Sequence, residues 1–177
     1  HWGGEEQGLN GSRAFVEDRP EVVKNLQALF NQDNGTGRVV NISGQGFKQS
    51  EKFINRWLAQ VPDTIKNQIK LSFPGMPSGG GSDHSSFVTA GAPGFSLSSL
   101  SWDYRTYTWH TNRDSYDKLV FEEIRNNAIL TAILVYMACE EPERFTTERA
   151  DLPVDERTGK KAVWPEQKKA TRKGGLD

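Results

Sequence analysis

The sequence contains a single cysteine, Cys139, among its 177 residues. One cysteine excludes an intrachain disulfide and a zinc site built from paired CxxC motifs. Long apolar runs are also missing, since the longest covers residues 128–139 and includes a threonine. A membrane-spanning helix needs about 20 apolar residues. We therefore expect this run to form a buried helix, and we expect no membrane span.

The sequence has no excess of charge of either sign. It has 22 Lys and Arg against 23 Asp and Glu, for a formal net charge of −1. This balance excludes nucleic-acid binding driven by electrostatics and a broad basic surface for membranes. The chain starts at His1 without an initiator methionine or a basic leader, so its start does not identify a compartment. The abrupt start before a dense motif leads us to expect missing upstream sequence and an incomplete domain.

The composition is sufficient for one folded domain. Hydrophobic residues make up 35% of the chain, which includes five Trp and nine Phe, and this aromatic content argues against disorder. A length of 177 residues fits one domain but not comfortably two. Residues 151–177 are charged and rich in lysine. We expect this tail to wrap over the surface or to be partly disordered.

Strand-like and helix-like segments alternate along the chain, which predicts an α/β layer architecture. The expected strands are residues 26–31, 38–43, 68–73 and 94–100, and the expected helices are residues 11–18, 48–61, 82–90 and 119–139. Ser82 is expected to be the N-cap of the third helix. On the last helix, the side chains expected to face mostly inward are Ile124, Ala128, Ile133, Val135 and Met137.

Four polar segments could carry chemistry, but each also has a simple structural explanation. They are WGGEEQGLNGS at residues 2–12, NQDNGTG at 31–37, GGGSDHSSF at 79–87 and WHTNRDSYD at 109–117. The glutamates of the first could be solvated acids at a helix N-terminus. Asn34-Gly35 is typical of a type I′ hairpin turn between two strands. The third could be a flexible loop before a capped helix, and His110 could be an ordinary structural histidine.

Taken together, the four segments contain the donor types of a zinc hydrolase. Carboxylates at strand ends and a late histidine supply hard oxygen and imidazole ligands. At a strand-to-helix junction, consecutive residues point in different directions. One carboxylate of the adjacent pair Glu5 and Glu6 can then bind a metal while its neighbour reaches the metal-bound water. The pair therefore has the chemistry of a ligand next to a general base.

In their order along the chain, the four segments resemble the catalytic half of the co-catalytic di-zinc exopeptidases. This family includes bacterial di-zinc aminopeptidases and plasma-type glutamate carboxypeptidases. The resemblance covers roughly residues 1–140, and GEEQGL and HTNRDSYD are its most specific motifs. It implies a mixed β-sheet sandwiched between helices. It also implies that residues 1–150 are the C-terminal part of a di-zinc peptidase catalytic domain, followed by the charged tail.

The resemblance assigns roles to individual residues. Glu5 corresponds to the general base that takes a proton from the zinc-bridging water. Glu6 and His110 correspond to ligands of one zinc ion, and Asp33 corresponds to a ligand of the other. A complete site would therefore hold two zinc ions.

Further positions are implied to bind the substrate or to support the ligands. The residues implied to line the substrate pocket are Ser82, Asp83, His84 and Trp109. Asp114 follows the ligand histidine, and we expect it to orient the loop that carries this ligand.

The sequence also departs from the family pattern. The family has two more ligands upstream of the glutamate pair, a histidine in an HxD motif and an aspartate that bridges both metals. We expect both on a missing N-terminal segment. The family often has a tyrosine before the last histidine, where it stabilises the tetrahedral intermediate. This chain has Trp109 there, which has an N–H donor but no hydroxyl, and Tyr104 and Tyr107 are the candidate substitutes.

The resulting functional hypothesis is a zinc-dependent exopeptidase that hydrolyses terminal peptide bonds. It leaves open whether the enzyme is an aminopeptidase, a carboxypeptidase or a dipeptidase. The family habit implies a secreted or periplasmic protein. Three alternatives stay open: a glutaminyl cyclase-like enzyme with a single zinc, a non-catalytic relic that binds peptides, and a metal-free binding domain whose resemblance is coincidental.

Overall fold

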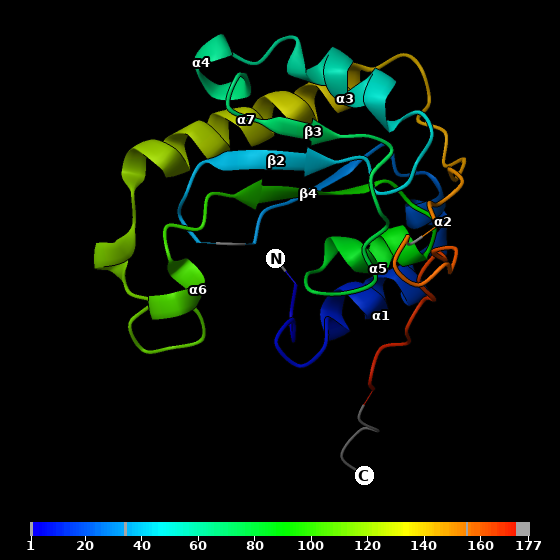
Figure 1. The fold of residues 1–177 in the computed structure, drawn as a ribbon, viewed down its shortest axis with the longest axis horizontal. Helices are drawn as coiled ribbons and strands as arrows, with labels where there is room; N and C mark the ends of the chain where they lie inside the picture. The colour runs from blue at the N-terminus through cyan, green and yellow to red at the C-terminus, as the bar shows by residue number, and fades with distance from the viewer. Residues whose placement is uncertain (1, 34, 155, 173–177) are drawn as a thin grey trace.

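The structure is a computed structural model and describes residues 2–33, 35–154 and 156–172. In this part of the chain the helices are α1 (Asn10–Asp18), α2 (Pro20–Lys24), α3 (Ser50–Leu58), α4 (Asp63–Lys66), α5 (His84–Thr89), α6 (Tyr104–Tyr107) and α7 (Phe121–Glu140). The strands are β1 (Leu29–Asn31), β2 (Val39–Ser43), β3 (Lys70–Ser72) and β4 (Gly94–Ser99), and a 3₁₀ turn, η1, covers Tyr116–Lys118 (Figure 1).

The described strands form one mixed sheet in the order β1-β4-β2-β3. β1 runs parallel to β4, with Leu29 opposite Gly94, and β2 runs parallel to β3, with Ile42 opposite Leu71. β2 and β4 are antiparallel. Helices α3, α4 and α7 lie on one face of the sheet, and α1 and α5 lie on the other (Figure 1). The predicted α/β architecture, a mixed sheet between helices, is confirmed.

The strand pairing contradicts the hairpin explanation of the NQDNGTG segment. β1 and β2 flank this segment, but they do not pair with each other, because β4 lies between them. Asn34, the first residue of the expected turn, lies outside the described residues. The segment is therefore a crossing loop at the end of β1, which leaves its polar side chains available for a site.

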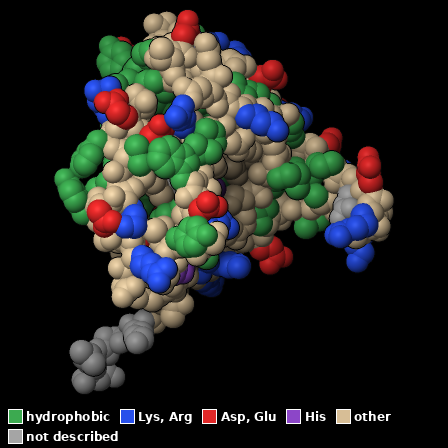
Figure 2. All heavy atoms as spheres, turned by 60° about the vertical axis from the view of Figure 1, so that its left-hand side comes forward, with side chains coloured by type: hydrophobic (Ala, Val, Ile, Leu, Met, Phe, Trp, Pro, Cys, Tyr) green, Lys and Arg blue, Asp and Glu red, His purple; other side chains and the backbone are tan. Residues whose placement is uncertain are grey.

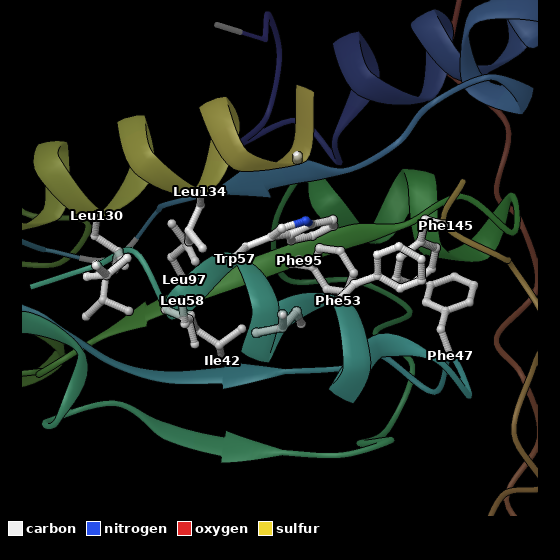
Figure 3. Packing of buried hydrophobic residues seen from close by; sticks show 14 residues of the cluster. Ile42, Phe47, Phe53, Trp57, Leu58, Phe95, Leu97, Leu130, Leu134 and Phe145 are labelled. Carbon is white, nitrogen blue, oxygen red and sulfur yellow. The ribbon is translucent and has the colours of Figure 1, made fainter. Parts of the chain in front are cut away.

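The main hydrophobic core lies between the sheet and the helices α3 and α7. On α3, the spacing of Phe53, Ile54 and Trp57 places all three side chains on the sheet side, where they are fully buried. From the opposite side, Phe95 and Leu97 of β4 project into the same cluster (Figure 3). Burying aromatic and branched side chains of this size stabilises the fold by about 1.5–3 kcal/mol each. This cluster fixes the sheet whose strand ends carry the candidate site.

The sequence pattern predicted the inward face of α7 only in part. Ile133 and Met137 pack against the main core, as expected. Of the side chains expected to point inward, Ala128 and Val135 are exposed. The buried face instead carries Glu123, Asn127, Leu130, Leu134 and Ala138. This helix is apolar around most of its circumference, so hydrophobic periodicity alone does not select one face.

Polar contacts explain the burial of the two polar residues on this face. The side chain of Asn127 accepts a hydrogen bond from the Val39 backbone N–H at 2.8 Å and donates one to the Gly37 carbonyl oxygen at 2.9 Å. Glu123 forms an ion pair with Arg38 at 2.8 Å. Both contacts tie α7 to the start of β2, and this tertiary pairing sets the rotation of the helix.

We expect Asn127→Ala to lower the free energy of unfolding by about 2–4 kcal/mol. It leaves a buried backbone N–H and a buried carbonyl without their partner, and each such group costs about 1–3 kcal/mol. Urea denaturation measures the change. The neighbouring Asn126→Ala is the matched control and should stay within about 0.5 kcal/mol of the parent. Equal losses in the two variants would show that the Asn127 bridge does not stabilise this register.

Several expected elements occur with altered boundaries. The strand expected from residue 26 begins only at Leu29, and three short helices, α2, α4 and α6, occur where none was expected. Ser82 is not the N-cap of α5. Asp83 occupies that position without a capping side-chain hydrogen bond. The hydroxyl of Ser82 is unavailable because it donates to Asp33.

The described part of the tail wraps over the body of the protein. The ring of Trp164 lies 5.4 Å from that of Phe47. Further along, the Ala170 backbone N–H donates to Glu17 on α1 at 2.6 Å, and Arg172 forms an ion pair with the same carboxylate. These contacts attach the tail to α1, the helix that follows Glu5 and Glu6.

The surface agrees with the balanced composition. On the face shown in Figure 2, basic and acidic side chains are interspersed and no field of one sign extends across it. No helix within the described ranges has the length and apolar character that crossing a membrane requires.

Candidate active site

The adjacent glutamates precede α1 in a tight loop held by its backbone. The Leu9 N–H donates to the Glu5 carbonyl oxygen at 2.8 Å, and Leu9 adopts a left-handed φ of 60°. The Gly11 N–H donates to the Gly3 carbonyl oxygen at 2.7 Å, and a Cβ at position 11 would lie 2.4 Å from that oxygen. The loop therefore closes only with glycine at position 11, and in this closed form Glu5 and Glu6 line one cavity.

His110 reaches the same cavity from the loop after α6. Its backbone has a left-handed φ of 58°, a conformation that costs a non-glycine residue about 1–3 kcal/mol and is concentrated at functional sites. Its ring stacks on Trp109 with the ring centroids 4.0 Å apart. Its Nε2 atom lies 3.1 Å from Oε1 of Glu6. Two residues far apart in the sequence are thus brought into direct contact.

Asp33 enters the cavity from the loop after β1, where a short relay of hydrogen bonds orients it. Asn31 Nδ2 donates to Ser82 Oγ at 2.7 Å, and Ser82 Oγ donates to Asp33 Oδ2 at 2.6 Å. An amide nitrogen only donates, so the single hydroxyl proton of Ser82 is directed at the carboxylate. Among the residues that the structure describes, the relay engages Oδ2 of Asp33 and orients this carboxylate, which lines the cavity.

The cavity has a volume of about 500 Å³. Its lining residues are Glu5, Glu6, Asp33, Gly81, Tyr104, Arg105, Trp109, His110, Thr111 and Asp114. The structure therefore brings the expected base and the three expected ligands into one cavity. Burial, followed by the charges of Asp33 and Glu6, raises the pKa of Glu5 above its usual value. A carboxyl with a raised pKa is better suited to exchange protons near neutral pH.

The SDH segment does not line the cavity, contrary to expectation. Ser82, Asp83 and His84 are each only 6% exposed, and Gly81 is the residue of this loop that reaches the lining. Helix α5 packs against β4 and β1, which draws these side chains behind the site. Burial lowers the pKa of His84 to about 4, so this histidine is neutral at physiological pH. Ser82 thus acts through Asp33 and makes no direct contact with the cavity.

Asp114 was expected to orient the loop of His110, but its hydrogen bond is with Tyr104, another residue of the cavity. The Tyr104 hydroxyl donates to Asp114 Oδ2 at 2.9 Å. Burial and this hydrogen bond raise the pKa of Tyr104 to about 12, so the phenol keeps its proton. Of the two tyrosines considered as substitutes at Trp109, only Tyr104 lines the cavity, whereas Tyr107 is 59% exposed. Trp109 itself lines the cavity, as expected.

Sequence reasoning missed Arg105 and Thr111 in the lining and the contribution of Asn31 to the relay. Each lies within or just before one of the four polar segments, so proximity to these motifs was the available signal. Their directions depend on the fold of the loop after α6 and on the pairing of β1 with β4.

The residues present fit a metal site in part. Ligands of one tetrahedral zinc ion, each about 2.0–2.2 Å from the metal, lie about 3.3 Å from one another. The 3.1 Å separation of Glu6 Oε1 and His110 Nε2 agrees with this spacing. No cluster of three or more His, Cys, Asp or Glu side chains arranged for a metal occurs among the residues that the structure describes. The chain thus presents a pair of donors and a separate aspartate.

Comparison with models of known protein families shows the family of this chain. The model of peptidase family M28 matches residues 1–135, which include every lining residue of the cavity. The chain belongs to peptidase family M28. No curated protein matches the sequence.

Solved structures of M28 proteins share this fold. The chain is similar to the peptidase M28 precursor from Shewanella amazonensis SB2B, with a TM-score of 0.64 and 22% identity over 82% of this chain and 32% of that one. It is also similar to LapA from Legionella pneumophila, with a TM-score of 0.59 and 20% identity over 79% of this chain and 39% of that one. A second structure, of the Legionella pneumophila LapA aminopeptidase, is similar with a TM-score of 0.57 and 20% identity over 78% of this chain and 38% of that one. The chain thus spans between about a third and two fifths of the length of these structures.

Proposed function

We propose that this M28 chain carries the base and three metal ligands of a zinc-dependent exopeptidase that hydrolyses terminal peptide bonds. The observation that supports the proposal most is the convergence of Glu5, Glu6, Asp33 and His110 on one cavity of about 500 Å³. These residues come from three separate loops, so their meeting is a product of the fold. A cavity of this size admits one or two residues of a peptide.

Within this proposal Glu6 and His110 hold one zinc ion, and Asp33 holds a second. When bound, zinc supplies a Lewis acid that polarises the scissile carbonyl and makes water more acidic. The relay through Ser82 holds Asp33 in place, and support of this kind typically changes metal affinity 10–100-fold.

Glu5 is the general base of the proposed reaction. Its carboxylate takes a proton from the attacking water and delivers it to the leaving amine, which balances the proton across the cycle. Burial and the charges of Asp33 and Glu6 raise the pKa of Glu5 in the metal-free chain, and a higher pKa makes this carboxylate a stronger base toward the water. Tyr104 keeps its phenolic proton and lines the cavity, so we assign it, and not Tyr107, to the place of the family tyrosine.

The proposed metal site needs ligands beyond those described. A zinc site ordinarily has three or four protein ligands, whereas Glu6 and His110 give two for one ion and Asp33 gives one for the other. We propose that an N-terminal segment, joined to this chain or separate, supplies a further histidine and a bridging aspartate. We also propose a location outside the cytoplasm, which rests on the family habit.

The test is an assay of terminal-residue peptide substrates with added zinc, on the chain alone and together with the upstream segment. We expect the isolated chain to be nearly inactive and poor in zinc. The complemented protein should turn over substrate, contain two zinc ions per chain and lose activity on chelation. His110→Ala is the loss-of-ligand control. Substantial zinc-dependent turnover by the isolated chain would contradict the proposed ligand set, and inactivity of a zinc-loaded complemented protein would contradict the activity.

A further inference from the structure

The cavity contains an arginine that the proposed chemistry does not use. Its described lining includes the carboxylates of Glu5, Glu6, Asp33 and Asp114, and Arg105 is the lining residue with a permanent positive charge. A guanidinium stays protonated at any physiological pH. Arg105 therefore gives one side of an acidic cavity a fixed positive charge.

Three of the four carboxylates of the cavity, all but that of Glu5, are engaged with other partners. The partners are His110 for Glu6, Ser82 for Asp33 and Tyr104 for Asp114. The contact found for Arg105 is with the ring of Trp109, whose centroid lies 5.6 Å from the guanidinium carbon. Within the described ranges, no carboxylate lies within ion-pair distance of Arg105. Arg105 is exposed, so its planar fork of N–H donors faces solvent at the cavity wall and is accessible to a ligand.

Backbone hydrogen bonds close the turn that carries this arginine. The Tyr104 carbonyl oxygen accepts hydrogen bonds from the N–H groups of Thr108 and Trp109 at 3.0 and 2.9 Å. The Tyr104 ring lies against Gly35, where a Cβ would approach it to 3.1 Å. Arg105 and Trp109 therefore lie on one closed turn that packs against the loop of Asp33. Such pre-organisation lowers the entropic cost of binding a ligand.

We propose that Arg105, stacked on Trp109, binds a carboxylate of the peptide substrate. This inference rests on the proposed exopeptidase function and names its substrate class. A guanidinium matches a carboxylate through two parallel hydrogen bonds, which makes this pairing stronger and more directional than a neutral one. The carboxylate is either the α-carboxylate of a C-terminal residue or the side chain of an acidic residue.

The position of the subsite places this carboxylate close to the cleaved bond. The ring of Trp109 contacts both Arg105 and His110, so the guanidinium lies one aromatic layer away from the proposed ligand. One extended residue spans about 3.3–3.6 Å. The separations of 5.6 Å from the guanidinium carbon to the Trp109 ring and 4.0 Å from that ring to the His110 ring keep Arg105 within about three extended residues of His110. The bound carboxylate would therefore belong to a residue at or near the scissile bond.

The experiment measures binding to the metal-stripped chain, in which no hydrolysis competes. The first pair of probes is glycyl-leucine and glycyl-leucinamide, which differ only in the C-terminal carboxylate. The second pair is glutamyl-leucinamide and glutaminyl-leucinamide, which differ only in a side-chain carboxylate. NMR titration follows the Arg105 Nε–H and Trp109 indole N–H signals and gives the ratio of acid to amide affinity for each pair.

We expect Arg105→Gln to lower the acid-to-amide ratio of one pair about tenfold, since a hydrogen-bonded charge is lost. The pair affected identifies the source of the carboxylate. The matched control is Arg113→Gln, an exposed arginine of the same loop that does not line the cavity, and it should keep the parent ratio. The acidic neighbours are the same in all three proteins and repel a given acid alike, so comparing each acid between proteins isolates Arg105.

Three outcomes would overturn the subsite. They are an unchanged ratio in Arg105→Gln, an equal fall in Arg113→Gln, and the absence of any carboxylate-dependent binding to the parent chain. Each would leave Arg105 as a surface residue stacked on an aromatic ring. The readout needs neither zinc nor turnover. A failed subsite and a failed exopeptidase function therefore give different results.

Discussion

Glu5→Gln in the zinc-loaded, complemented protein should lower kcat about 10²–10⁴-fold while leaving the zinc content nearly unchanged. Glutamine has nearly the same shape as glutamate but cannot accept the proton of the attacking water, and general base catalysis contributes about this factor. Glu5 lines the cavity, and within the described part of the chain it makes no contact comparable to that between His110 and Glu6. Steady-state kinetics and elemental analysis of the same preparation measure the two quantities.

Glu6→Gln is the matched comparison for this prediction, because the two glutamates are adjacent and the change is chemically identical. It should lower zinc occupancy, since a carboxamide oxygen is a weaker ligand than a carboxylate. Activity should recover in part when zinc is added in excess. Equal zinc loss in the two variants would show that the roles of base and ligand are misassigned.

Trp57→Ala should lower the free energy of unfolding by about 3–5 kcal/mol, the range for truncating a large buried aromatic side chain. Trp57 is fully buried between sheet and helices, with ring centroids 5.9 Å from Phe30 and 5.7 Å from Phe53 (Figure 3). Its Nε1–H donates to Glu141 at 3.2 Å, so truncation also removes a partner from a buried carboxylate. For a chain of this length the melting temperature should fall by about 10 °C.

Trp102→Ala is the control for this substitution, because the indole at position 102 is 53% exposed. It removes the same atoms without leaving a cavity and should change the free energy of unfolding by less than about 1 kcal/mol. Urea denaturation of both variants under identical conditions gives the comparison. Similar losses at the two positions would mean that the α3–sheet cluster is not the main core.

Adjacent or regularly spaced residues made much of the fold predictable. The cluster Phe53, Ile54 and Trp57 has helical spacing, and the structure places it on the buried face of α3. The strand order was not predictable in this way. β4 inserts between β1 and β2, and nothing in the 31–37 segment shows that its flanking strands do not pair.

The candidate site was predictable where a motif carries several functional side chains at once. Glu5, Glu6, Asp33 and His110 were chosen from the sequence, and the structure places all four in one cavity. Their roles as base and ligands stay predictions. Arg105 was not found, because a lone arginine has no sequence pattern that distinguishes a cavity wall from an open surface.

The SDH segment was recognised as a motif, but the sequence did not show where its side chains point. They are buried behind the cavity and do not line it. A serine before a short helix is typical of an N-cap, and nothing local distinguishes a hydroxyl that caps a helix from one that reaches another loop. Asn31 donates a hydrogen bond to the Ser82 hydroxyl, so the proton of this hydroxyl is directed to Asp33 and not to the start of the helix. That contact exists only once β1 lies beside β4.

By itself, the sequence determined the α/β class and most element positions, because these depend on local periodicity. Its four motifs, through their resemblance to a known family, predicted the four residues of the proposed site. Only the tertiary structure decided the strand order, the buried face of α7 and the partners of Ser82 and Asp114. These depend on contacts between residues far apart in the chain, such as Asn127 with the Val39 backbone. Such contacts are made only after the sheet has formed, and their energies outweigh the small local preferences of helix face and cap.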